Sequence, residues 1–397
     1  MSSNADKRSS IITPSLISKT DLTLKDVIGR GHYGVVLKST WKHRDGIEIE
    51  CAVKVLTQSP EKLVQEIVHM QKLSHENIVQ LYGVCLEEPV LMVLELCDGG
   101  SLAARLKDHS KPTPLVTTLL KYAIQIAEGM RYLETQGYVH RDLAARNVLL
   151  TKDEQTAKIA DFGLTRHLEP DQSLYEMSQN AQLPFSWCPP ESLRYKKFSS
   201  QSDVWAFGVT IWEMFQYEKE DPWMNLSSRM VLEKIEAGER LSKPLYCPQE
   251  IYKIMLECWD FVPQARPNFT ILTNKLKGFE FDVFDLDKKE KSAYEAPIGS
   301  PHSNKFIIVD YDDLDNIIAQ NVSSGKFCKF SPDGELTEIE NNDTSLLPPV
   351  QPRTSSSRTD TTLFPPIQRR TSSSRTDSTF SAHKPPVVKK PTFLSEH

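Results

Sequence analysis

The alternation of apolar and polar residues divides the chain into a strand-rich part and a helix-rich part. Three early runs have the composition and pattern of strands: GVVLKSTW (34–41), ECAVKVL (50–56) and VLMVLEL (90–96). In later segments the apolar residues recur every three or four positions, as in LLKYAIQIAEGMRYLE (119–134) and SDVWAFGVTIWEMF (202–215). This pattern predicts a small β-rich lobe followed by a larger helical lobe.

One helix interrupts the strand-rich part. Ser59 is a favourable N-cap residue and Pro60 suits the first helical turn. Leu63, Ile67 and Met70 then recur at helical spacing in EKLVQEIVHMQKL. We therefore expect a helix that begins near residue 60.

The composition changes near residue 285. From 281 to 348 there are six Lys and Arg against fourteen Asp and Glu, whereas from 349 to 397 there are eight against three. The basic part contains a duplicated 17-residue unit: PPVQPRTSSSRTDTTLF is followed by the near-copy PPIQRRTSSSRTDSTF, which is one residue shorter. These copies have too few apolar residues to offset the entropy of an ordered chain. The predicted domains are a flexible N-terminus (1–20), a folded domain (21–280) with lobes at 21–97 and 98–280, an acidic linker with a possible short docking segment (281–347), and a disordered basic tail (348–397).

The bulk composition restricts the location and the partners. The net charge of −6 gives no field that would attract nucleic acid or a membrane. The seven cysteines are scattered without a CxxC pair, which is typical of a reducing compartment. No apolar run reaches the roughly 20 residues that a transmembrane helix needs, and MSSNADKRSS lacks the apolar core of a signal peptide. We expect a cytoplasmic protein without a transmembrane segment, recruited to membranes only through partners.

Two features of the strand-rich part point to phosphate binding. Gly29, Gly31 and Gly34 form a GxGxxG pattern in GRGHYGVV, where glycine allows backbone amides to approach phosphate oxygens. Taken alone, this pattern is more often a simple hairpin turn. Lys54 alternates with Val53 and Val55 in the next strand, and on its own it would be read as a solvent-facing lysine. Glu66, twelve residues later on the predicted helix, could hold this lysine for pairing with phosphate.

A dense polar stretch, HRDLAARNVLL, occupies residues 140–150. Asp142 could accept a proton from a hydroxyl group, and Asn147 offers a carbonyl oxygen to a metal ion. The DFG sequence at 161–163 adds Asp161, a hard carboxylate of the kind that Mg²⁺ prefers. A solvated turn would explain the charges of the first stretch, but not the recurrence of the full set in this order.

The motifs follow one another in the order Gly-rich loop, strand lysine, helix glutamate, HRD…N and DFG. In this order the chain resembles the eukaryotic protein kinases, from about residue 22 to 280. The resemblance implies an α+β fold of two lobes that bind ATP between them, with Mg²⁺, or Mn²⁺ as a substitute. It implies a catalytic set and a metal pair: Asp142, Arg146, Asn147, Lys54 and Glu66 for catalysis, and Asn147 with Asp161 for the metal. It also implies an ATP-binding set: Ile28, Gly29, Gly31, Gly34, Val36, Ala52, Lys54, Leu94, Glu95, Cys97 and Leu149.

Within that family the chain is more similar to the tyrosine kinases. Ala144 stands where serine/threonine kinases usually carry Lys, and Arg146 follows it in HRDLAARN. The segment LPFSW (183–187) agrees, because its Pro and Trp shape a platform for an aromatic acceptor in that family. A dual-specificity or serine/threonine kinase remains the nearer alternative, and a kinase-fold signalling scaffold the more distant one. Tyr175 matches an activation-loop tyrosine, which would bind Arg141 and Arg166 once phosphorylated.

Finer similarity is to the Ack family of non-receptor tyrosine kinases, carried by stretches such as LPFSWCPPESL (183–193) and KIEAGERL (234–241). The resemblance implies protein tyrosine substrates and a role in intracellular signalling. Two further expectations are that Asp203 braces the HRD loop and that Glu191 pairs with Arg266. Members of the family typically carry a Src-homology domain after the kinase and then a GTPase-binding segment. Neither is recognisable here, so direct binding of a Rho-type GTPase is doubtful.

The region after the kinase offers short motifs with competing interpretations. Tyr311, in VDYDDLDNII, and Tyr294 are candidate autophosphorylation sites, because many tyrosine kinases favour acidic surroundings. The equally favoured alternative is a short segment that packs on the kinase through Ile307, Ile308 and Leu314. Proline-rich PPVQPR and KPPVVKKP in the tail could bind proline-recognising Src-homology domains.

Overall fold

The computed structural model describes residues 15–31, 34–56, 60–169, 172–178, 183–217, 220–281, 283–285, 305–312, 316–331 and 335–339. The chain divides into two parts, 1–347 and 348–397, and every described residue belongs to the first part. The predicted disordered tail therefore lies outside the described residues.

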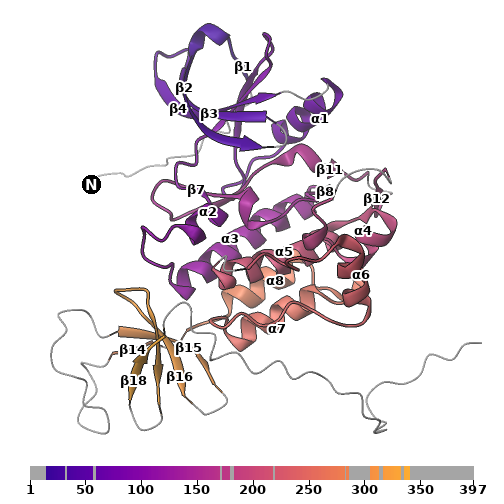
Figure 1. Cartoon of the computed structure of the whole chain (residues 1–397). Coiled ribbons are helices and arrows are strands. Elements are labelled where there is room, and N and C mark those ends of the chain that lie inside the picture. The colour runs from indigo at the N-terminus through magenta and orange to yellow at the C-terminus, as the bar shows by residue number, and fades with distance from the viewer. Residues whose placement is uncertain are drawn as a thin grey trace, which may run out of the picture. The chain divides into compact units, whose positions relative to one another are not determined.

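The first lobe contains a six-stranded sheet with one helix, which confirms the predicted β-rich lobe (Figure 1). The strand order is β1-β5-β6-β4-β3-β2, and all pairs are antiparallel except β1 with β5. The elements are β1 (Ser15–Leu16), β2 (Leu22–Gly31), β3 (Gly34–Lys42), β4 (Glu48–Leu56), α1 (Pro60–Gln71), β5 (Leu81–Cys85) and β6 (Leu91–Glu95).

The beginning of this lobe corrects one predicted boundary. Residues 15 and 16 form β1 against β5, and Ile17 is buried in the core on this side of the sheet. The prediction of a flexible N-terminus through residue 20 is therefore wrong for residues 15–20. A single apolar pair followed by polar residues gave too short a pattern to identify as a strand.

Helix α1 begins at Pro60, as its sequence predicts. Ile67 and Met70 are buried on its inner face, whereas Val64 and Val68 are exposed on the outer face. Glu66 is also buried, although it is charged. Its carboxylate therefore lies on the side of the helix that faces the sheet.

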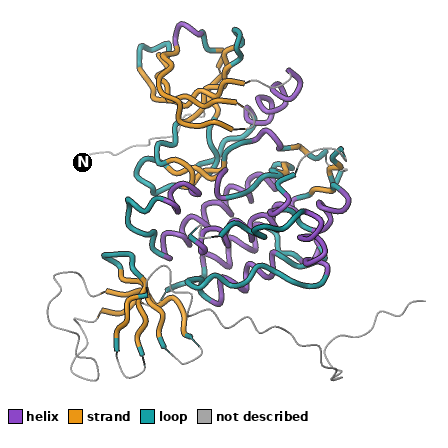
Figure 2. Tube along the Cα trace, in the orientation of Figure 1, coloured by secondary structure: helices purple, strands orange, loops and turns teal. Residues whose placement is uncertain are grey.

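The second lobe is built mainly of helices, as the 3.6-residue periodicity predicts (Figure 2). Helix α5 is its centre, because almost every side chain between Ser202 and Phe215 is buried. Ser199 and Ser202 form a capping box at its start. The helices are α2 (Leu102–Lys107), α3 (Val116–Thr135), α4 (Pro190–Tyr195), α5 (Ser200–Gln216), α6 (Ser228–Glu236), α7 (Gln249–Cys258) and α8 (Phe269–Lys277).

Short strands and 3-10 turns carry the polar motifs through this lobe. The antiparallel pair of β9 and β10 links the HRD…N stretch to DFG, and β8, just before HRD, pairs with β11, just after DFG. Their bounds are β7 (Gly100–Ser101), β8 (Tyr138–Val139), β9 (Val148–Leu150), β10 (Ala157–Ile159), β11 (Arg166–His167), β12 (Tyr175–Glu176) and β13 (Lys197–Phe198). The predicted two-lobed α+β architecture is confirmed.

A second antiparallel sheet follows the helical lobe and overturns the prediction of an acidic linker. Its order is β14-β15-β16-β17-β18. The bounds are β14 (Val283–Asp285), β15 (Lys305–Tyr311), β16 (Ile317–Asn321), β17 (Phe327–Phe330) and β18 (Leu336–Glu338).

The acidic composition concealed these strands, because charged residues lie beside the apolar ones that form the sheet. Ile307 and Val309 belong to the same buried cluster as the helical lobe, so the predicted packing through Ile307 is confirmed. Asp310 and Asp312 are balanced by ion pairs with Lys243 and Lys329. Ile308 is half-buried, Tyr311 is exposed, and Leu314 and Tyr294 lie outside the described residues.

Candidate active site

The predicted pair between the strand lysine and the helix glutamate is present. Lys54 Nζ lies 2.6 Å from Glu66 Oε1 and 3.3 Å from Asp161 Oδ1. Burial would lower the pKa of Lys54, but the two carboxylates outweigh it and raise that pKa. The ammonium group therefore stays charged, and β4, α1 and the DFG segment meet around it.

The DFG segment has a specific local geometry. Asp161 adopts a left-handed conformation with φ of 61°, while Phe162 is fully buried. The Phe162 ring meets His140 edge-on, with the ring centroids 5.3 Å apart. Because Phe162 is anchored in the core, Asp161 is turned toward Lys54.

The catalytic loop is held by α5, as predicted. The carboxylate of Asp203 accepts hydrogen bonds from the backbone N–H groups of His140, at 2.7 Å, and Arg141, at 2.9 Å. Burial raises the pKa of Asp203 to about 7, against these two donors. The predicted pair of Glu191 with Arg266 is also present, with two hydrogen bonds of 2.7 and 2.9 Å.

Asp142 lies at the centre of a small polar network. Its Oδ2 accepts a hydrogen bond of 2.8 Å from Asn147 Nδ2, and its other carboxylate oxygen pairs with Arg146. Burial raises the pKa of Asp142, and the charge of Arg146 opposes that shift. A carboxylate whose pKa is moved upward is a better proton acceptor near neutral pH.

The residues predicted to bind a metal have suitable chemistry. Asn147 uses its amide nitrogen to contact Asp142, so the carbonyl oxygen is its group suited to a cation. The backbone oxygen of Asn147 accepts from Ala160 N at 2.8 Å, which keeps it next to Asp161. An amide oxygen and a carboxylate are hard ligands that fit a divalent cation bound with phosphates.

The predicted nucleotide residues come from adjacent strands. Ala52 in β4 pairs with Leu94 in β6, and Leu149 in β9 pairs with Ser101 in β7. Glu95 forms an ion pair of 2.9 Å with Lys158. The remaining positions are distributed as follows: Ile28 exposed, Gly29 and Gly31 in β2, Gly34 and Val36 in β3, and Cys97 buried after β6.

The Gly-rich loop is a turn between β2 and β3. Gly31 pairs with Gly34, whose φ of 141° is a conformation that side chains rarely adopt. Residues 32 and 33, at the tip, lie outside the described residues. The glycine at position 34 is thus required by the backbone of the turn.

Beside Asp142, Trp187 of the 183–187 segment stacks with Arg146, and together they form a flat wall. The Arg146 guanidinium lies 4.3 Å from the centroid of the Trp187 ring. Glu213 on α5 accepts hydrogen bonds from Trp187 Nε1, at 2.9 Å, and from the backbone N of Ala145, at 3.0 Å. The same carboxylate thereby ties the wall to the catalytic loop.

The sequence reasoning missed Glu213. It stands in the quoted run SDVWAFGVTIWEMF, where it is the one acidic residue after Asp203, and it is 7% exposed. A carboxylate inside a nearly continuous apolar helix is costly unless it is paired. That signal could have identified it.

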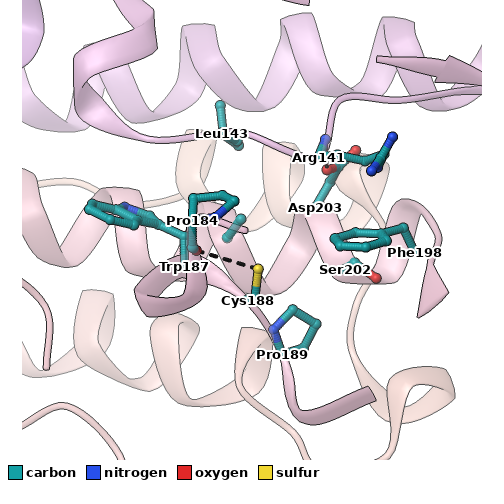
Figure 3. Close-up of a pocket in the computed structure, with 10 residues that line it drawn as sticks. Arg141, Leu143, Pro184, Trp187, Cys188, Pro189, Phe198, Ser202 and Asp203 are labelled. Carbon is teal, nitrogen blue, oxygen red and sulfur yellow. Dashed lines mark hydrogen bonds between the residues drawn. The ribbon is translucent and has the colours of Figure 1, made fainter. Parts of the chain in front are cut away.

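A small pocket lies behind this wall, between the catalytic loop and α5 (Figure 3). Cys188 Sγ donates to the backbone oxygen of Pro184 at 3.4 Å, and Phe198 lies beside Arg141. Of the polar residues that line it, Asp203 holds the loop and Ser202 caps α5. The pocket is therefore part of the framework of the site.

The predicted regulatory residues are close together. The Arg141 guanidinium lies 4.4 Å from the centroid of the Tyr175 ring, and that of Arg166 lies 5.5 Å from it. Strand β12, which contains Tyr175, pairs with β13. Burial and the charge of Arg166 lower the pKa of Arg141 to about 10.

Comparison with known proteins agrees with this geometry. Residues 22–276 match the family of protein tyrosine and serine/threonine kinases, so the chain belongs to this protein kinase family. Proteins of this family bind ATP and transfer its terminal phosphoryl group. A divalent metal and protein substrates are general to the family.

The curated relatives are tyrosine-protein kinases. The chain is 39% identical to tyrosine-protein kinase sid-3 of Caenorhabditis elegans over 354 residues, or 87% of this chain and 28% of that protein. It is 43% identical to activated Cdc42 kinase Ack of Drosophila melanogaster over 315 residues, 77% of this chain and 29% of that protein. It is 37% identical to human tyrosine-protein kinase Fer over 263 residues, 66% of this chain and 31% of that protein.

These percentages also show how little of each relative the chain covers. The chain spans less than a third of the length of these relatives. A match that covers 87% of a 397-residue chain has to include the region of β14–β18 wherever it begins, whereas the match to Fer is little longer than the kinase region. No helix in the described part of the chain is long and apolar enough to span a membrane.

Proposed function

We propose that this chain transfers the terminal phosphoryl group of Mg-ATP, or Mn-ATP, to tyrosine hydroxyl groups in proteins. The observation that carries the proposal is the Arg146–Trp187 stack beside Asp142. A flat wall next to the proton acceptor suits an aromatic ring, which reaches further than the short side chain of serine. The tyrosine-kinase relatives support the same choice.

The residues divide the work in the way the family requires. The bound metal supplies positive charge to the phosphates, and Asn147 with Asp161 would hold it. Lys54, fixed by Glu66, pairs with phosphate oxygens. Asp142 orients the hydroxyl and accepts its proton as the new O–P bond forms and the bond to ADP breaks.

We also propose regulation through Tyr175. Phosphorylation would add a charge of about −1.5 to −2 next to Arg141 and Arg166. Both guanidinium groups already lie against the tyrosine ring, so little movement is needed to form ion pairs. The role in intracellular signalling and the binding of proline-recognising domains by the tail belong to the same proposal. Direct binding of a Rho-type GTPase is not part of it.

The test uses the full chain with Mg-ATP and a peptide pool that contains Tyr, Ser and Thr acceptors. Phosphotyrosine should form, and Asp142→Asn should reduce its rate by about a thousandfold while nucleotide binding persists. Phosphoserine or phosphothreonine as the main product would favour the serine/threonine alternative. Nucleotide binding without transfer, even with phosphorylated Tyr175, would favour the scaffold.

A further inference from the structure

The β14–β18 sheet contacts the helical lobe at the start of α3, far from it in sequence. Gln320, fully buried in β16, accepts a hydrogen bond of 2.8 Å from the backbone N of Val116, the first residue of α3. Its side-chain nitrogen donates to the backbone oxygens of Pro114, at 3.2 Å, and Gly325, at 2.9 Å.

This contact supplies what the helix itself lacks. The N-cap residue of α3 is Leu115, which has no side-chain acceptor for the first amide groups of the helix. Gln320 fills that role from 204 residues away in sequence. A buried amide side chain that satisfies two backbone groups on another element fixes both position and register.

An aromatic stack adjoins the polar contact. The Phe327 ring of β17 lies parallel to Tyr246, with the centroids 3.8 Å apart and the planes at 12°. It also meets Tyr217 edge-on at 5.9 Å. Tyr217 is buried at the end of α5, and its hydroxyl donates to Pro114 O, the oxygen that Gln320 also contacts.

Backbone contact at the β16–β17 turn leaves no spare room. Gly325 has a φ of 71°, and a Cβ added there would lie 2.6 Å from the backbone oxygen of Thr113. An ion pair between Asp310 and Lys243 closes the other side of the junction. Thus strands β16 and β17, the turn between them and the Asp310–Lys243 ion pair all contact the helical lobe.

The two faces of the sheet have different partners. Ile307, Val309, Ile318, Phe327 and Ile339 belong to the buried cluster of the helical lobe. Phe306, Ala319, Cys328 and Phe330, which alternate with them, form a separate cluster within the sheet. The sheet therefore has its own core and presents a second apolar face to the kinase.

We infer that the base of the helical lobe is a docking surface for the chain's own β14–β18 sheet, and that the catalytic unit extends to about residue 339. The sheet caps α3, the helix that leads through β8 into the catalytic loop. Without it, the amide of Val116 and the apolar faces of Tyr217 and Tyr246 would be left to solvent. This inference holds whichever hydroxyl the enzyme phosphorylates.

The test compares full-length variants by hydrogen exchange and thermal unfolding. Gln320→Leu removes the polar contacts without opening a large cavity, and Gly325→Ala forces the turn away from Thr113. In both variants, the amides of residues 113–122 should exchange about tenfold faster. The unfolding temperature of the two kinase lobes should fall by about 5 °C. Thr337→Ala, on the exposed strand β18, is the matched control and should change neither quantity.

The same data show whether the sheet itself remains folded. Protection of amides in β15–β17, with loss at 113–122, is the expected pattern for undocking. Unchanged exchange at 113–122 in both variants would overturn the inference. A second result would also overturn it. In the wild-type chain with bound nucleotide, the sheet would unfold in a separate step at lower temperature, and the two lobes would still unfold at the same temperature as in the variants.

Discussion

Two buried polar junctions join distant parts of this chain, and they differ in chemistry. The first, Lys54 with Glu66 and Asp161, is ionic and brings together β4, α1 and the DFG segment. The second, Gln320 with Val116 and Pro114, is neutral and joins the β14–β18 sheet to α3. A charged junction can act on phosphate, whereas a neutral amide holds backbone groups in place. We therefore expect the first to govern catalysis and the second to govern stability.

The largest effect should follow from breaking the ionic junction. Lys54→Met removes the charge that pairs with phosphate, so transfer should fall by at least about a hundredfold. It also leaves Glu66 buried without its cation, which costs about 3 kcal/mol of folding stability. Steady-state kinetics and denaturant unfolding measure the two losses.

The contrast with the neutral junction completes that experiment. Gln320→Leu should retain the wild-type turnover at 25 °C to within about twofold, while its unfolding temperature falls. Lys42→Met, an exposed lysine at the end of β3, controls for loss of positive charge in the same lobe. More than a tenth of the wild-type rate in Lys54→Met would contradict the assigned role of this lysine.

A smaller loss is expected at the junction between the catalytic loop and the aromatic wall. Glu213→Gln keeps the shape but removes the charge that holds Ala145 N and Trp187 Nε1. The kcat/KM for peptide should fall by about tenfold, with the KM for ATP unchanged. Glu233→Gln, in an exposed pair on α6, is the control. An equal rise in both KM values would mean that Glu213 only supports the fold.

Activation through Tyr175 should depend on the nearby arginines. If phosphorylation of Tyr175 raises the rate severalfold, Arg166→Gln should reduce that gain by about threefold, because one of two guanidinium partners is lost. Arg229→Gln, on the exposed face of α6, should keep the full gain. A gain that survives in Arg166→Gln would exclude this arginine as a phosphate partner.

The smallest effect concerns pH. Transfer needs ionised Asp142, so kcat/KM should decrease as pH falls through the pKa of this group, which burial raises. Arg146 opposes that shift, and Arg146→Gln should therefore move the acid limb toward higher pH, by about half a unit. A pH-rate profile of the wild type and the variant measures it. Movement toward lower pH would show that Arg146 does not act on Asp142 in this way.

The residues of the first junction, and most of the candidate active site around it, could be predicted from the sequence. These residues occur in ordered motifs, and each motif sets the local backbone conformation that places the side chain. They are Lys54, Glu66, Asp142, Asn147 and Asp161. The brace from Asp203 was also readable from the resemblance. Glu213 stands out in the sequence as a carboxylate inside an apolar helix, but its partners, a backbone N–H and an indole, leave no mark there, so its role was missed.

The second junction was not predictable in the same way. Composition across 281–347 is acidic, and the strands there have only three to seven residues. The continuous apolar run from Phe306 to Val309 is consistent with a strand but does not show which surface covers it. The cap on α3 depends on Gln320, a residue type that carries no signal of its own.

The sequence by itself determined the two lobes, the order of the catalytic motifs and the helix that carries Glu66, because local periodicity and short-range spacing set these. The tertiary structure alone decided that the acidic segment is a sheet, that this sheet caps α3 and that Glu213 joins two loops. These depend on contacts between residues tens to hundreds of positions apart, where the free energy comes from burial and paired polar groups rather than from local preference.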